Sequence, residues 1–175
     1  MNGAFLKTVN NMKKVILLLS LIVLGVSADA QLTEGRLQWA IKQAKRGYMA
    51  FQVDVAKHYE YHKDYTQAIY WYKMAAAPRK NDSYGSTTAN IALGKFYYEG
   101  IHVPQDYSKA VEHFRRAGGF GSAYLGRCYY YGHGVPQDKT KGLELARQGA
   151  SPSYDTGINE SKLIYNKLIN DYYGN

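Results

Sequence analysis

The sequence predicts an all-α protein, an array of helix pairs that packs as a single domain. The segment 93–106 returns 32 residues later, and ten of the seventeen positions of 93–109 are identical in the second copy, so the chain carries an internal repeat. Apolar side chains in each copy recur three and four positions apart, which is the spacing of one helix face. A hydrophobic content of 46% with 21% charged residues is typical of a packed core.

Residues 1–30 are predicted to be a secretory signal peptide. Two lysines at 13–14 precede an apolar run over 15–26, and Ala28-Asp29-Ala30 supplies the small residues of a cleavage site. The run is shorter than the roughly 20 residues that a membrane-spanning helix needs, so a retained anchor is the weaker alternative. We therefore expect an exported chain, periplasmic or secreted, that begins at Gln31.

The mature chain, 31–175, is predicted to be a single α-solenoid domain with an unpaired helix at each end. The first of these helices, 31–47, carries an apolar stripe that ends before a glycine. A helix at 158–173 is expected to cap the other end of the array. Between them we expect three helix-pair repeats, at 49–77, 87–117 and 121–149.

Each repeat is predicted from the same local signals. In the second repeat, a helix that contains Leu93 and Gly94 ends at Gly100. Pro-Gln-Asp then opens the next helix, where the carboxylate of Asp106 can accept hydrogen bonds from free amide groups. Ala110 is small enough to let the two helices approach closely. The third repeat has the corresponding structural residues Leu125, Gly126, Gly132 and Asp138.

The two clearest repeats, LGKFYYEGIHVPQDYSKAVEHFRRA and LGRCYYYGHGVPQDKTKGLELARQGA, resemble Sel-one-like (SEL-like) repeats, relatives of the tetratricopeptide repeat. The resemblance covers about 55–150 and departs from the family pattern at Gly142, where Ala is usual, and at the tight turn 118–121. It implies an α/α superhelix, a short right-handed solenoid of antiparallel helix pairs. It also implies a protein-interaction scaffold, commonly in bacterial signalling or envelope functions, with no catalytic residues to transfer.

One column of the repeat is basic and aromatic. Lys57, Lys95 and Arg127 occupy the same place in three successive first helices, and Tyr98 and Tyr130 follow three residues after the last two cations. We expect these five residues to form the partner-binding surface, because Arg and Tyr supply charge and rigid contact area at low entropic cost. The alternative is that the tyrosines pack between neighbouring helices and the cations merely face water.

The net charge of the chain is +8, and it falls to +6 when residues 1–30 are removed. A positive field favours anionic partners.

The leading function that the repeats predict is an exported scaffold that binds a protein or peptide along the curved face of its repeats. A binder of anionic cell-wall polymer or of a lipid surface is the alternative, and an envelope hydrolase ranks last. We expect no nucleic-acid partner and no stable membrane anchor, and the sequence leaves the oligomeric state open.

Reactive groups are sparse, so we expect no enzyme, catalytic residue, metal or cofactor. Cys128 stands where the preceding repeat has Phe96, which indicates a buried core position rather than a nucleophile. His58 and His62 lie one helical turn apart, but two ligands without a third make a poor metal site. The glycines of 118–121 are not followed by the Gly-Lys-Ser or Gly-Lys-Thr of a phosphate-binding loop.

Overall fold

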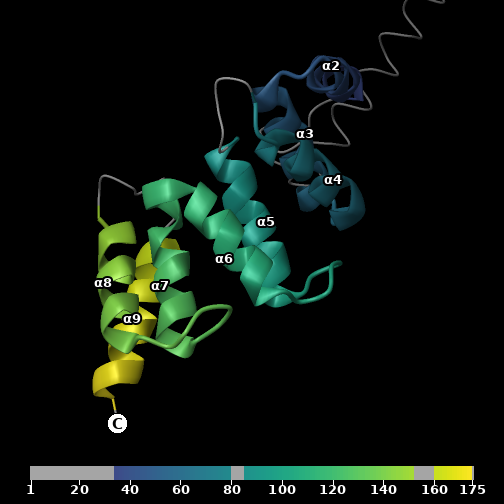
Figure 1. Ribbon diagram of the computed structural model, residues 1–175. Coiled ribbons are helices and arrows are strands. Elements are labelled where there is room, and N and C mark those ends of the chain that lie inside the picture. The colour runs from purple at the N-terminus through teal and green to yellow at the C-terminus, as the bar shows by residue number, and fades with distance from the viewer. Residues whose placement is uncertain (1–33, 80–84, 152–159, 175) are drawn as a thin grey trace, which may run out of the picture. The chain divides into compact units, whose positions relative to one another are not determined.

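The computed structural model describes residues 34–79, 85–151 and 160–174, and the elements in these ranges are helices (Figure 1). From Leu37 onwards the chain forms one compact unit. Within the described ranges, no helix combines the length and the apolar composition needed to cross a bilayer. In chain order the elements are α2 (Glu34–Lys45), α3 (Met49–Tyr61), α4 (Tyr65–Ala76), α5 (Thr87–Glu99), α6 (Tyr107–Arg116), the 3-10 helix η1 (Gly118–Gly121), α7 (Ser122–Tyr131), α8 (Lys139–Gly149) and α9 (Glu160–Tyr173).

The helices pair in chain order. Helix α3 packs against α4, α5 against α6, and α7 against α8. Helix α4 also contacts α5, and α6 contacts α7, so each pair rests on the next pair. Helix α9 packs against both members of the last pair. This stacking of helix pairs is an α/α solenoid, as the sequence predicts.

The loop between the two helices of a pair is held by its own side chains. Gly100 ends α5 in the left-handed conformation with φ of 71°, a region that glycine enters without steric cost. Gln105 Nε2 donates to the carbonyl oxygen of Tyr98 at 2.9 Å. Asp106 Oδ1 then accepts from the backbone N–H of Lys109 at 2.9 Å, which caps α6. The loop of the third repeat makes the same contacts through Gly132, Gln137, Tyr130, Asp138 and Lys141, so both predicted caps are confirmed.

The buried side chains form two clusters. One joins α2, α3, α4 and α5, and the other joins α5 through α9. Leu93, Ala110 and Phe114 are fully buried in the helices of the second repeat. Cys128 is also fully buried, which confirms the core position that the repeat register predicts.

The third repeat is packed more closely than the second. In α5, Gly94 faces the ring of Phe114 on α6, with the ring between the two backbones. In α7, the corresponding Gly126 faces Ala146 and Gly142 of α8, and a Cβ added at Gly126 would lie 2.6 Å from the Gly142 carbonyl oxygen. The small residues therefore let the α7 and α8 backbones come into contact. This contact explains why Gly142 stands where Ala is usual.

The predicted signal peptide, 1–30, lies outside the described residues and stays a prediction. The predicted first helix, 31–47, and the predicted closing helix, 158–173, also begin outside them. Helices α2 and α9 are described from Glu34 and Glu160 onwards.

Candidate functional site: a groove along the first helices

A groove of about 560 Å³ opens between α3 and α5. Helix α4, η1, α7 and the start of α9 complete its walls, so it draws on residues from every repeat. Its walls are apolar and aromatic, with charged groups among them. A volume of this size is in the range of ligand-binding clefts. The charged lining residues are Lys57, Glu60, Lys95, Glu99 and Glu160.

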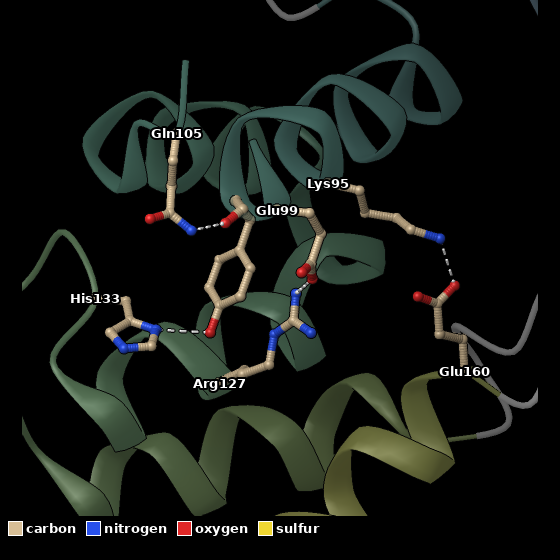
Figure 2. A network of polar contacts seen from close by, with 7 residues as sticks. Lys95, Glu99, Gln105, Arg127, His133 and Glu160 are labelled. Atoms are coloured by element: carbon tan, nitrogen blue, oxygen red, sulfur yellow. Dashed lines mark hydrogen bonds and ion pairs between the residues drawn. The ribbon is translucent and has the colours of Figure 1, made fainter. Parts of the chain in front are cut away.

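The cation in the middle of the groove is already paired. Lys95 Nζ of α5 lies 2.9 Å from Glu160 Oε2 at the start of α9, 65 residues further along the chain (Figure 2). Glu160 also approaches the buried Tyr124 of α7, and burial together with this carboxylate raises the pKa of the Tyr124 phenol. The ion pair therefore joins the second repeat to the last helix.

Arg127 is engaged at the junction between the second and third repeats. Its guanidinium carbon lies 3.8 Å from the ring centroid of Tyr98, and its Nη2 lies 3.4 Å from Glu99 Oε1. The Tyr98 hydroxyl shares a hydrogen bond of 2.7 Å with His133 Nδ1 (Figure 2). Burial raises the pKa of Tyr98 to about 12, although the positive charge of Arg127 acts in the opposite direction. These contacts hold one repeat on the next, so Arg127 and Tyr98 are structural residues.

Lys57 differs from the other two cations of this column. It is exposed on α3, lines the groove, and forms no ion pair within the described part of the chain. The neighbouring Glu60 accepts a hydrogen bond of 2.6 Å from the Tyr72 hydroxyl. Burial and this carboxylate raise the pKa of Tyr72, so the phenol stays protonated and remains the donor. The ammonium of Lys57 is thus available to a bound acidic group.

The structure corrects the expectation for the two tyrosines. Tyr98 is 8% exposed and Tyr130 is 2% exposed, so neither ring can offer contact area to a partner. Tyr98 packs edge-on against Tyr107, and Tyr130 packs edge-on against Tyr131. The tyrosines fill space within and between repeats, which is the alternative that the sequence left open.

The acidic groove residues Glu99 and Glu160 were not identified from the sequence. Glu99 lies four residues after Lys95 and therefore on the same helix face, a spacing that could have placed it in the groove. Glu160 carries no comparable signal, because its contact with Lys95 depends on how α9 docks.

The structure places Cys128, His58 and His62, the reactive side chains that the sequence singles out, on α7, on α3 and at the end of α3. Burial raises the pKa of the Cys128 thiol to about 12, which leaves it protonated and inaccessible. The rings of His58 and His62 are 4.5 Å apart between centroids. In the ranges that the structure describes, no group of three His, Cys, Asp or Glu side chains could hold a metal ion.

Comparison with known families shows a similarity to the Sel1 repeat over residues 62–77, 87–118 and 121–151. The first of these matches begins within the first helix pair, and the other two span the second and third pairs. Comparison with curated protein sequences gives no significant match. Sel1 repeats generally mediate protein–protein interaction, and their fold is typically a non-catalytic scaffold.

Two solved structures show the same fold. A protective antigen of uropathogenic Escherichia coli with an SLR fold aligns with a TM-score of 0.64 at 21% identity, over 79% of this chain and 30% of the antigen. A Sel1 repeat protein from Oxalobacter formigenes aligns with a TM-score of 0.57 at 25% identity, over 75% of this chain and 97% of that protein. The chain therefore spans less than a third of the antigen's length.

Proposed function

We propose that this chain, which is a Sel1 repeat protein, is an exported, non-enzymatic scaffold that binds a protein or peptide segment in the groove between α3 and α5. The observation that carries the proposal is the groove itself, whose lining combines apolar side chains with Lys57, an exposed cation without an ion pair in the described part of the chain. The signal-peptide pattern of residues 1–30 supports export, and an exported scaffold would act in the periplasm or outside the cell.

The groove indicates the chemistry of the bound segment. Ile91, Ile101 and Phe120 line it with at least partly exposed side chains and favour apolar or aromatic side chains. Lys57 favours a carboxylate on the partner, whereas Lys95 already forms an ion pair with Glu160. The partner segment is therefore apolar or aromatic with an acidic residue that reaches the Lys57 end of the groove.

The proposal is tested by selecting peptides from a displayed library on the full chain and measuring the Kd of a selected peptide for variants. Thr88→Trp places a large side chain at an exposed position that lines the groove and should block it. Lys57→Glu reverses the available cation. We expect each change to weaken binding by about tenfold or more, which corresponds to about 1.4 kcal/mol.

The matched control is Lys73→Glu, which makes the same charge change at an exposed position of α4 that does not line the groove. It should leave the Kd unchanged, and all three variants should keep the helicity of the original chain. If the groove variants bind as the original chain does, or if Lys73→Glu weakens binding equally, the groove is not the partner site.

A further inference from the structure

A second cationic site lies at the junction of the second and third repeats, outside the groove. Tyr129 of α7 is half-buried between Arg115 of α6 and Lys141 of α8. Arg115 Nη2 lies 3.4 Å from the Tyr129 hydroxyl oxygen, and Lys141 Nζ lies 4.1 Å from the centroid of the Tyr129 ring. Both cationic side chains are exposed, so a ligand can reach them. We refer to these three residues as the Tyr129 site.

The repeat provides an internal comparison for Lys141. Lys109 holds the same place in the second repeat, three residues after the cap Asp106, and its Nζ pairs with Asp106 Oδ2 at 2.9 Å. Lys141 also follows its cap, Asp138, by three residues, but no ion pair joins them. Lys141 instead lies against Tyr129.

The same comparison applies to Arg115. In the third repeat the corresponding Arg147 binds Glu144, three residues earlier, through two hydrogen bonds of 3.0 Å. Arg115 has Glu112 at the same spacing but reaches the Tyr129 hydroxyl and forms no ion pair in the described ranges. Arg115 and Lys141 therefore both contact Tyr129. Neither forms the ion pair with a nearby acidic residue that its counterpart in the other repeat forms.

We propose that the Tyr129 site binds a phosphate group, either free or carried on a lipid headgroup. A guanidinium, an ammonium and a phenol hydroxyl can all donate to the oxygens of one tetrahedral anion. A phosphate monoester carries a charge of roughly −1.5 to −2 near neutral pH, so it balances two cations, whereas a carboxylate balances one. Contacts from Arg115 and Lys141 lower the pKa of Tyr129, which shows that both cations stabilise negative charge at this point.

The test uses the full chain labelled for NMR and titrated with inorganic phosphate near neutral pH, with the ionic strength held constant by sodium chloride. The Arg115 Nε–H resonance and the Tyr129 ring resonances should shift and saturate. The double variant Arg115→Gln/Lys141→Gln should weaken phosphate binding by about tenfold or more. Lys109→Gln/Arg147→Gln removes the same charge from the corresponding positions in the other repeats and should leave binding unchanged.

A second arm separates the two sources of phosphate. Cosedimentation with phosphatidylcholine vesicles, with and without phosphatidic acid, reports whether the site reaches a lipid-borne phosphate. Binding to phosphatidic acid that the Arg115→Gln/Lys141→Gln change removes supports a headgroup site. Binding of inorganic phosphate without vesicle binding supports a soluble phosphate ligand. The proposal is overturned if inorganic phosphate produces no saturable shift and phosphatidic acid adds no vesicle binding, or if both double variants lose binding equally while circular dichroism shows unchanged helicity.

Discussion

Restoring the usual alanine at Gly142 should destabilise this protein. A Cβ added there would lie 2.7 Å from the Tyr130 backbone nitrogen, 2.8 Å from the Gly126 carbonyl oxygen and 2.9 Å from the Tyr130 Cα. These are backbone atoms of α7, which no side-chain rotation can move away. The corresponding Ala110 is tolerated in the second repeat, where Phe114 lies between the helices.

The magnitude follows from two opposing effects. Overpacking a core contact costs about 1–3 kcal/mol. The higher helix propensity of alanine offsets up to about 1 kcal/mol of that cost. Because the added Cβ meets backbone atoms, the upper part of that range applies, about 2–3 kcal/mol. Subtracting the propensity gain leaves a net loss in the free energy of unfolding of about 1–2 kcal/mol, which at this chain size lowers the Tm by about 2–8 °C.

Thermal unfolding followed by far-UV circular dichroism measures this change. Gly35→Ala is the control, with the opposite expected effect on the Tm, because Gly35 lies in α2 and an added Cβ there meets no atom of the described residues within 4 Å. Its Tm should stay unchanged or rise, since alanine lowers the entropic cost of forming the helix. A Gly142→Ala variant that melts at or above the Tm of the original chain would refute close backbone contact between α7 and α8.

Three further predictions concern single side chains. Asp138→Ala removes the cap of α8 and should lower the Tm by about 2–4 °C, while Asp138→Asn, which retains the acceptor oxygen, should lower it less. Cys128 should react with a thiol reagent only at the rate at which the chain unfolds, and immediate reaction in native buffer would contradict its burial. Burial, reinforced by Arg116, lowers the pKa of His113 to about 4, so the unfolded chain binds the proton more readily. Stability should therefore fall as the pH decreases from about 6.5 towards 4, and His113→Gln should reduce this slope in urea titrations at several pH values.

The local part of the fold could be predicted from the sequence because it depends on short-range chemistry. Gly100 and Asp106 act within a few residues of their own positions, one by entering the left-handed region and the other by capping the next helix. The repeat register then carries these assignments to the third repeat. Cys128 could be placed in the core for the same reason, since its counterpart Phe96 lies on the apolar face of its helix.

The candidate site could be predicted only in part, because its electrostatics depend on contacts between repeats. Three cations in one column indicate a basic surface, but the sequence does not show that α9 brings Glu160 to Lys95. Nor does it show that Arg127 lies over the Tyr98 ring. Whether a helix residue is exposed depends on the helix that packs over it, and an internal repeat alone does not fix that packing.

One repeated position therefore has different roles along the array. Lys57 remains available at the first repeat, whereas Lys95 and Arg127 hold later elements together. Reversing the charge of Lys57 should then change partner affinity with little effect on unfolding. Reversing the charge of Arg127 would place a carboxylate beside Glu99 and remove the cation from the Tyr98 ring. The main effect of this change should therefore be a lower Tm. A partner that needs a cation in this column must bind towards α3, because the cations at the other end already have intramolecular partners.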